Sequence, residues 1–565
     1  MTGRDVLLRG GEVLDGTGAP AVPADVRVRA GRIVEVAPDL RPDGEPVFDA
    51  SGAFVTPGFI DSHAHTDPQV FWDPTLDPEP LHGVTTMLIG NCSLSLHPVN
   101  ESTRDDIADL FAYVEDVPRH LFDEHVPWTW SDYAGYRDAV NDRGAGTNLA
   151  ALVGHSPLRL TVMGDDAWTR VATPDERAAM ATSLRQAMDA GAWGLSTSQF
   201  DVDARGRPVP SRAADDAEMD ALLDVLGAAG HGVVEIVPRL LDVADPFALL
   251  EALARRCGAR GVPLTWTGFT YNEANPRACE KWLDLVRRLR GEGIALLPQL
   301  SPRTVDLRLS WDSSMMFMGL PEGWHRVIAA RGEAKADLLG DPTWRTTARE
   351  EWDRVGRTIF PHHRPERVRF VELGSAVDPR WLGRTFADLL AERDGHPSDV
   401  LADFVLENDF ELGLVAQGIA NADVDGVGRT LADPDVLISS SDAGAHLQMI
   451  CASGDTTLVL TRHVRERADL TVERAVHEMT GRQAEVFGFR DRGVIAAGAV
   501  ADLVVFALDQ LHYDTDGFVN DLPGGGRRLR RPEGGYRATF VDGVAVQVDG
   551  ELTGELPGRV ISSLA

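Results

Sequence analysis

The chain has 565 residues, of which 43% are hydrophobic and 25% are charged, so it has the composition of a folded globular protein and not of a disordered or low-complexity chain. It carries 55 Lys and Arg against 87 Asp and Glu, a formal net charge of −32. Such an acidic surface repels phosphate backbones and anionic membranes, so we expect neither a nucleic-acid partner nor a membrane partner.

No apolar run reaches membrane-spanning length, and the N-terminus has no continuous apolar segment of a signal peptide. The four cysteines, Cys92, Cys257, Cys279 and Cys451, form neither a CxxC pair nor a dense framework, which argues against a zinc ribbon or a disulfide scaffold. We therefore expect a cytoplasmic enzyme acting on a small-molecule substrate. The sequence gives no indication of the oligomeric state.

Both ends of the chain show short alternating segments separated by glycine turns, the pattern of β-hairpins. Neither end holds enough strands for a stable sheet of its own. Residues 1–53 and 495–565 are therefore predicted to combine into one small β-sandwich domain. The segments are Asp5–Arg9, Ala24–Arg29, Arg32–Val36, Asp502–Ala507, Ala538–Val541 and Val544–Val548.

Residues 54–494 show eight short apolar runs that alternate with helical patterns such as Pro174–Ala190 and Ala217–Ala228. This predicts an α/β fold with a covered parallel sheet, and the number of runs favours a (β/α)8 TIM-like barrel over a doubly wound sheet. The interval 301–435 is too long for one helix and is predicted to be an insertion over the barrel mouth. The runs are Ala53–Ile60, Val84–Gly90, Asn148–Val153, Ala192–Ser196, Gly232–Pro238, Val262–Thr267, Ile294–Leu300 and Val436–Ser440.

Two histidines, His63 and His65, follow the first apolar run. Residues two apart on a strand point to the same face, and barrel active sites lie at the carboxyl ends of strands. Paired imidazoles in that position favour a metal site, although two surface histidines near a loop would give the same pattern. Cys92 follows the second run and could supply a thiolate to the same ion, or be an inert core thiol.

Asp442 follows the eighth run, where an aspartate beside a metal can take a proton from water and pass it to a leaving group; a turn or helix-capping aspartate is the alternative. His446 lies four residues later and is predicted to contact substrate; a hydrogen-bond donor behind the ligands and an ordinary loop histidine are the alternatives. His155 ends the third run and is predicted to bind substrate, although metal ligation and hydrogen bonding near the mouth both stay open.

The sequence resembles the amidohydrolase superfamily, and more narrowly the N-acyl-D-amino-acid deacylase (D-aminoacylase) family. The similarity runs through nearly the whole chain in the same order. The resemblance implies a metal-bearing barrel with a β-sandwich built from both termini, and hydrolysis of an amide bond. The matching segments are 56–65 (TPGFIDSHAH), 83–86 (GVTT), 90–93 (GNCS), 154–159 (GHSPLR), 191–198 (GAWGLSTS), 441–446 (SDAGAH) and 498–503 (GAVADL).

By this resemblance His63, His65 and Cys92 are metal ligands and Asp442 is the catalytic aspartate and a further ligand. Many amidohydrolases bridge two metals with a lysine, but the only two lysines, Lys281 and Lys335, lie in helix-like segments. We therefore expect no lysine bridge.

The sequence departs from the family pattern on the fifth and sixth strands, where histidine ligands are implied. The fifth run has Glu235, a predicted substitute ligand, and the sixth has no metal-binding side chain. We expect zinc, one or two ions, because two His, one Cys and carboxylates suit it best.

Three function hypotheses follow. The first is a metal-dependent amidohydrolase that cleaves the amide of an N-acyl amino acid. The second is a hydrolase of a cyclic amide, an imide or a specialised metabolite, and the third is a binding or scaffold protein with a degenerate metal site. Arg159, Arg239 and Arg303, near strand ends, are candidates for holding a substrate carboxylate, with Arg159 the predicted substrate-binding residue; Trp311 and Phe317 of the insertion are candidates for a lid.

Overall fold

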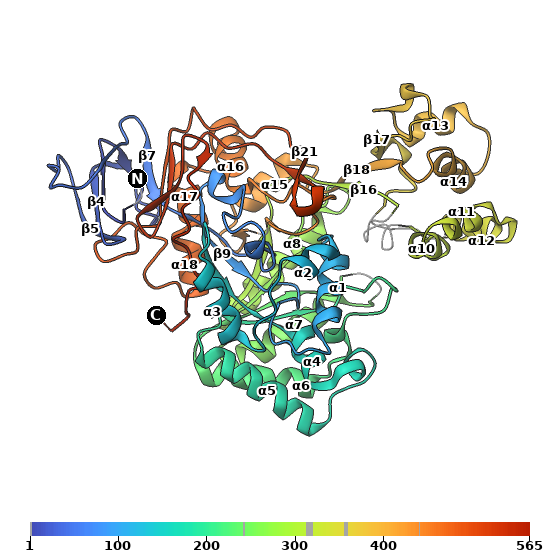
Figure 1. Cartoon of the computed structure of the whole chain (residues 1–565), viewed down its shortest axis with the longest axis horizontal. Helices are drawn as coiled ribbons and strands as arrows, with labels where there is room; N and C mark the ends of the chain where they lie inside the picture. The colour runs from blue at the N-terminus through green and yellow to red at the C-terminus, as the bar shows by residue number, and fades with distance from the viewer. Residues whose placement is uncertain (1–2, 241–242, 312–319, 355–359, 440, 565) are drawn as a thin grey trace.

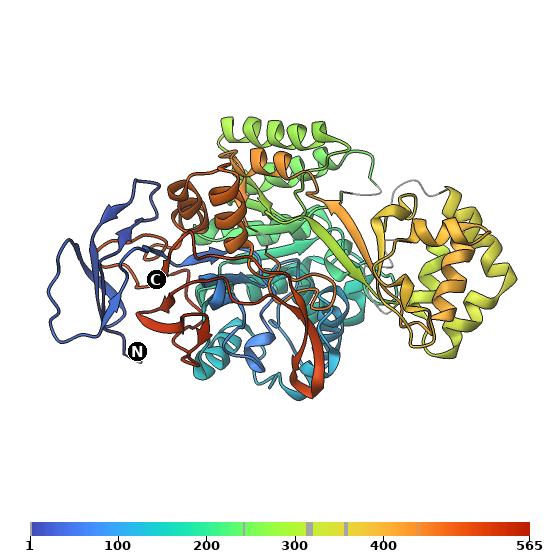
Figure 2. The ribbon, with the colours of Figure 1, turned by 90° about the horizontal axis from the view of Figure 1, so that it is seen from above.

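The computed structural model describes residues 3–240, 243–311, 320–354, 360–439 and 441–564 (Figure 1). A central body holds the parallel strands and most helices, the first strands of the chain lie at one end, and a helical lobe lies at the other (Figures 1 and 2). Within the described residues, no helix combines the length and apolarity that a membrane crossing requires.

The central body contains two parallel sheets, one in the order β10-β9-β8 and one in the order β11-β12-β13-β14-β15-β19. β10 and β11 are separated by one residue, so the same stretch of chain joins both sheets. After β8 and β19, Ala64 and Ala443 form a parallel bridge. The strands are β8 (Phe59–Asp61), β9 (Val84–Ile89), β10 (Asn148–Ala151), β11 (Val153–Gly154), β12 (Gly194–Ser198), β13 (Val233–Val237), β14 (Leu264–Trp266), β15 (Leu296–Leu300) and β19 (Leu437–Ile438).

Helices separate most successive strands of the parallel sheets, so the predicted α/β class is confirmed. The helix predicted over Pro174–Ala190 is α5 (Pro174–Asp189), which begins with a capping box at Thr173 and Glu176. The helices used below are α1 (Arg104–Val114), α4 (His155–Met163), α6 (Asp216–Ala229), α8 (Pro276–Gly291) and α15 (Val424–Leu431).

One sheet made from both ends of the chain and one made from the N-terminal end alone lie beside the central body. A seven-stranded sheet has the order β25-β24-β23-β20-β7-β2-β3, in which β20 (Leu503–Phe506) pairs with β7 (Phe54–Pro57). A four-stranded sheet has the order β5-β4-β1-β6. Val28, Val55 and Val505 belong to one buried cluster, so the two ends share a core. The other strands are β1 (Val6–Arg9), β2 (Glu12–Val13), β3 (Val22–Pro23), β4 (Asp25–Arg29), β5 (Arg32–Ala37), β6 (Val47–Asp49), β23 (Ala538–Val541), β24 (Val544–Val548) and β25 (Glu551–Leu552).

The insertion forms a separate lobe with its own core. β16 (Val305–Leu309) and β18 (Gly413–Ala420) connect it to the body, and β17 (Val368–Glu372) pairs with β18. Figures 1 and 2 show the lobe at the end of the body opposite the first strands of the chain, and its position over the barrel mouth stays a prediction. Its helices are α10 (Glu322–Ala329), α11 (Glu333–Gly340), α12 (Pro342–Arg354), α13 (Phe386–Glu392) and α14 (Pro397–Glu407).

Trp311, a candidate for a lid, is part of the core of the lobe. Trp311 is buried in the core of the lobe, with its ring 5.8 Å from that of Trp324. It therefore supports the lobe and does not cover the strand ends. Phe317, the other lid candidate, lies outside the described residues.

Candidate metal centre and active site

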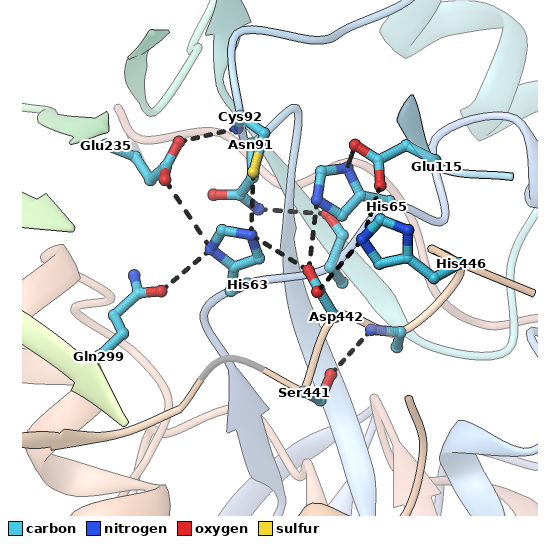
Figure 3. Close-up of polar contacts among 12 residues, drawn as sticks. His63, His65, Asn91, Cys92, Glu115, Glu235, Gln299, Ser441, Asp442 and His446 are labelled. Atoms are coloured by element: carbon cyan, nitrogen blue, oxygen red, sulfur yellow. Dashed lines mark hydrogen bonds and ion pairs between the residues drawn. The ribbon is translucent and has the colours of Figure 1, made fainter. Parts of the chain in front are cut away.

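Four predicted site residues meet beyond the carboxyl ends of the strands (Figure 3). His63 and His65 follow β8, Cys92 follows β9 and Asp442 follows β19. The segments after β8 and β19 are held together by two backbone hydrogen bonds: His65 N–H donates to Ala443 O at 2.6 Å, and Asp442 N–H donates to His63 O at 3.1 Å. This pairing places the two histidines and the aspartate on facing strands of backbone.

Gly444 permits this close approach. Its φ is +85°, and a Cβ on it would lie 2.8 Å from the carbonyl carbon of His65. Only glycine fits that conformation and that space without a shift of the backbone.

The reactive atoms of these residues share one centre. His63 Nε2 lies 3.3 Å from Cys92 Sγ and 3.4 Å from Asp442 Oδ1. His65 Nε2 lies 3.6 Å from the same carboxylate oxygen. One ligand atom from each of His63, His65 and Cys92 fits within 4.8 Å of the others. The predicted grouping of two imidazoles, a thiol and a carboxylate is therefore present.

The opposite nitrogen of each histidine faces a polar side chain. His63 Nδ1 lies 3.0 Å from Oε1 of Gln299, on β15, and His65 Nδ1 lies 3.4 Å from Oε1 of Glu115, which follows α1. The acceptor at Nδ1 of His63 favours the tautomer in which Nε2 carries the lone pair, and at His65 the carboxylate of Glu115 faces Nδ1 without forming a hydrogen bond. Both rings thus present Nε2 to the shared centre (Figure 3).

Glu235, predicted as a ligand, lies on the other side of His63. Its Oε2 accepts the backbone N–H of Cys92 at 2.8 Å, and its Oε1 lies 3.9 Å from His63 Nδ1. The carboxylate therefore holds the Cys92 loop, while Oε1 has no hydrogen-bond partner. Cys92 has a φ of +53°, so this loop adopts a conformation that needs such support.

Burial sets the charge states of these groups. It lowers the pKa of His63, and lowers that of His65 to about 3, which leaves both imidazoles neutral. It raises the pKa of the Cys92 thiol, which nearby carboxylates raise further. Burial also acts to raise the pKa of Asp442, but the neighbouring imidazoles in their protonated form and the Arg303 guanidinium outweigh it and lower the value, so this carboxylate is ionised at neutral pH.

The residues fit a divalent metal. Both ring nitrogens of His65 and Oε1 of Glu235 are buried without a hydrogen-bond partner, and such groups are costly unless something binds them. Neutral imidazoles, a thiol and an ionised carboxylate form a donor set typical of zinc and similar ions. A cation at the centre would also favour the thiolate of Cys92.

A cavity of about 220 Å³ opens from this centre. Its lining includes His446, as predicted for a substrate contact, and two carboxylates that the sequence analysis did not single out, Glu115 and Asp201. Asp201 follows β12 by three residues, so the strand-end rule could have found it. Glu115 follows a helix and carries no such signal.

Two predicted substrate-binding residues do not line this cavity. Both ring nitrogens of His155 have hydrogen-bond partners. Its Nε2 lies 2.7 Å from Oε1 of Glu218, and its Nδ1 lies 3.0 Å from Oγ1 of Thr197. Arg159 is fully buried, paired with Glu218 and bonded to the backbone oxygens of Ala167 and Arg170. The three side chains form a closed network between α4 and α6, which has no polar group left over for substrate.

The other cationic candidates also lie elsewhere. Arg303 donates to Asp455 at 2.8 Å and to Ser441 O at 2.6 Å, so it supports the loop before Asp442. Neither Arg303 nor Arg239 is among the described residues that line the cavity. Lys281 lies in α8 and Lys335 in α11, so both lie in helices, as the sequence predicted.

Comparison with known proteins identifies the family. Residues 46–301 and 404–547 match the sequence profile of the amidohydrolase family. The chain belongs to the amidohydrolase family. The predicted resemblance is thereby confirmed, as is the prediction of a hydrolase that acts on carbon–nitrogen bonds other than peptide bonds; the scaffold hypothesis is not supported.

Several relatives cover almost the whole amidohydrolase chain. An uncharacterized protein of Mycobacterium tuberculosis is 32% identical over 98% of this chain and 93% of its own length. An N-acyl-D-aspartate deacylase of Alcaligenes xylosoxydans xylosoxydans is 29% identical over 99% of this chain and 95% of its own. A D-aminoacylase from the same organism is 28% identical over 99% and 98%.

Solved structures agree with this assignment. A crystal structure of D-aminoacylase has 26% identity and a TM-score of 0.68, with 99% of each chain covered. Another D-aminoacylase structure, described for its binuclear metal centre, has 25% identity and the same TM-score and coverage. An N-acyl-D-glutamate deacylase from Bordetella bronchiseptica, complexed with zinc and a phosphonate inhibitor, has 25% identity and a TM-score of 0.66 over 99% of each chain.

Proposed function

We propose that this amidohydrolase is a zinc-dependent deacylase that cleaves the amide bond of N-acyl amino acids. The observation that carries the proposal is the meeting of His63 Nε2, His65 Nε2, Cys92 Sγ and the Asp442 carboxylate at one buried centre. The relatives named N-acyl-D-aspartate deacylase and D-aminoacylase support the substrate class.

His63, His65 and Cys92 would hold the metal, with Asp442 beside it. Glu235 remains a proposed ligand, because its Oε1 has no hydrogen-bond partner. It lies on the fifth strand, where the family resemblance implies a histidine. A divalent cation, when bound, polarises a carbonyl oxygen and lowers the pKa of water. These side chains offer enough donor atoms for one metal ion. A second ion is proposed by analogy with the D-aminoacylase that has a binuclear metal centre.

Asp442 is the residue that moves the proton. Its ionised carboxylate faces the shared centre and lines the cavity, so it can accept a proton from the attacking water and donate it to the departing amine. His446 Nε2 lies 3.9 Å from Asp442 Oδ2 and the side chain borders the cavity, which supports its predicted contact with substrate. His155 and Arg159 are proposed instead to fix α4 and α6.

The fold proposal follows the strand order. We propose that the two parallel sheets close into a (β/α)8 barrel through the β10–β11 stretch and the Ala64–Ala443 bridge. Residues 54–494 would form this barrel, with an insertion at 301–435, and residues 1–53 and 495–565 would form a β-sandwich.

A substrate screen tests the proposal. The purified chain, loaded with zinc, is offered N-acetyl-D-amino acids, N-acetyl-L-amino acids and cyclic imides, with and without a chelator. We expect turnover of N-acetyl amino acids that the chelator abolishes and added zinc restores. Turnover that persists in chelator, or that is confined to cyclic imides, would contradict the proposed function.

A variant pair tests the role of Asp442. Asp442→Asn is expected to lower kcat by about 10²–10⁴-fold, the usual contribution of general acid–base catalysis, while the protein stays folded. Asp425→Asn, an exposed aspartate on α15, is the matched control and should leave kcat unchanged. An equal kcat for wild type and Asp442→Asn would show that Asp442 does not transfer the proton.

A further inference from the structure

The cavity beside the metal centre is lined by acidic and apolar side chains. Its three carboxylates belong to Glu115, Asp201 and Asp442, and no lysine or arginine is found among the described residues of the lining. Two of these carboxylates already face histidines: Glu115 lies 3.4 Å from His65, and Asp442 lies 3.4 Å from His63. Asp201 is the one left facing the cavity without such a contact.

The local backbone fixes Asp201 in this position. Ser198, the last residue of β12, donates its hydroxyl to Asp201 Oδ2 at 2.5 Å and accepts the backbone N–H of Asp201 at 3.2 Å. Arg212 donates to the backbone oxygens of Phe200 and Asp201, at 2.8 and 3.2 Å. The guanidinium thus binds the loop, and within the described residues no ion pair joins a cation to the Asp201 carboxylate.

Apolar side chains make up much of the remaining lining, among them Val114, Phe200, Val202 and Val237. They suit an acyl chain, which is uncharged. The amine portion of the substrate would then occupy the polar part of the cavity, where Asp201 supplies negative charge.

Resting on the proposed deacylase function, we propose that this site selects N-acyl amino acids with a basic side chain, and that Asp201 pairs with the side-chain cation. A dication held by His63, His65 and Cys92 would be balanced by the Cys92 thiolate and the Asp442 carboxylate, so neither takes up the charge of Asp201, on which Arg212 acts electrostatically without an ion pair among the described residues. A substrate with an acidic side chain would meet like charge in a cavity without a guanidinium, which disfavours it.

Three substrates of matched length test the selection: the N-acetyl derivatives of lysine, norleucine and 2-aminoadipate, each in both enantiomers. They carry an ammonium, a methyl group and a carboxylate at the end of the side chain. With the zinc-loaded protein we expect kcat/KM for the lysine derivative to exceed that for norleucine by about tenfold or more, and the aminoadipate derivative to be the poorest.

Variants assign the effect to the residue. Asp201→Asn should remove the preference for lysine over norleucine, measured as the ratio of the two kcat/KM values, and Asp201→Glu, which keeps the charge, should retain that preference. Asp105→Asn, an exposed aspartate paired with Arg119, is the control. Zinc content and melting temperature of each variant show that it is folded and loaded.

The outcomes separate the two proposals. If none of the three derivatives is hydrolysed, the deacylase function itself fails. If norleucine or aminoadipate is hydrolysed as well as lysine, or if Asp201→Asn lowers all three rates equally, the deacylase function stands and the selection by Asp201 is wrong.

Discussion

The histidines of the metal centre owe their orientation to residues behind them. Gln299 contacts Nδ1 of His63 and Glu115 faces Nδ1 of His65, so each Nε2 is aimed at Cys92 and Asp442. Gln299 is itself held, since its Nε2 donates to Thr265 Oγ1 at 2.9 Å. Thr265 on the sixth strand and Gln299 on the seventh therefore orient the imidazole of His63. The family resemblance implies instead a direct metal ligand from the sixth strand.

Replacing this support is expected to weaken metal binding without unfolding the protein. Gln299→Ala should raise the zinc Kd by about 10–100-fold, the usual effect of losing an outer partner of a ligating histidine. Competition with a chromophoric chelator measures the Kd. Gln186→Ala, on the outer face of α5, is the control. An unchanged Kd in Gln299→Ala would show that His63 does not depend on this contact.

A carboxylate near the N-terminus allows a prediction of pH dependence. Burial alone would raise the pKa of Glu45, but backbone hydrogen bonds and the guanidinium groups of Arg27 and Arg29 outweigh it and lower the value to about 2. Because the folded pKa lies below the unfolded one, this stabilisation is complete above about pH 4.5 and is lost as the pH falls toward 2.

Glu45→Gln should therefore lower the free energy of unfolding at pH 7 and converge with wild type as the pH falls through this window. Urea unfolding at pH 7, 4 and 3 measures the difference. Glu35→Gln, a more exposed partner of Arg27, should change it much less. A difference that is the same at all three pH values would exclude the ion pairs as its cause.

The residue pattern predicted proximity best where a side chain follows a strand. His63, His65, Cys92 and Asp442 lie close together because strand ends converge whatever the helices do. Glu115 follows a helix, and only the folded chain brings it to His65. Arg159 was misread because a charged residue near a strand end is as often paired internally, here with Glu218, as it is presented to substrate.

At the level of elements, the apolar runs predicted the strands closely. Val84–Gly90 contains β9 and Gly232–Pro238 contains β13. The run Ala53–Ile60 differs, because Gly58 divides it into β7 and β8, which belong to different sheets. A Cβ at Gly58 would lie 2.1 Å from Thr85 Oγ1, so the division depends on tertiary contact that no local pattern reports.

Two helices are joined by a buried ionic network, and its loss should cost stability and not substrate binding. Glu218, on α6, forms ion-pair contacts with His155 and Arg159 of α4. Burial acts to raise the pKa of Glu218, but these two partners outweigh it and lower the value. Glu218→Gln leaves the Arg159 charge buried without its counter-ion, which typically costs about 3–5 kcal/mol.

Chemical denaturation measures this loss, and KM is measured in parallel. Asp224→Asn, on the exposed face of the same helix, should cost less than about 1 kcal/mol. Unchanged stability together with a raised KM in Glu218→Gln would indicate that His155 and Arg159 act in substrate binding and not in support of the helices.

On the scale of the whole molecule, the chain ends depend on each other. β20 lies between β7 and β23, so a strand from beyond residue 500 fills the middle of a sheet that begins at Glu12. The prediction rested on neither end holding enough strands alone, but β1, β4, β5 and β6 of the N-terminal end form a four-stranded sheet by themselves. The sequence of the insertion indicates a core but not the direction in which the core extends.

The insertion lobe should unfold without dismantling the metal centre. Trp324 is fully buried in the lobe's own core with Trp344 and Trp352, and Trp324→Ala typically costs about 3–5 kcal/mol. Calorimetry is expected to show an earlier lobe transition with unchanged zinc content. Leu382→Ala, at an exposed site in the lobe, is the control. Loss of zinc together with the lobe would show that the two parts are one cooperative unit.

The stoichiometry of bound metal, measured together with amide hydrolysis, tests the central claim most directly. Wild type, His65→Ala and Cys92→Ala are purified, dialysed against zinc and analysed by plasma emission. The account predicts near-stoichiometric zinc and hydrolysis of N-acetyl amino acids in wild type, and loss of both in each folded variant. Full zinc and full activity in His65→Ala and Cys92→Ala would contradict it.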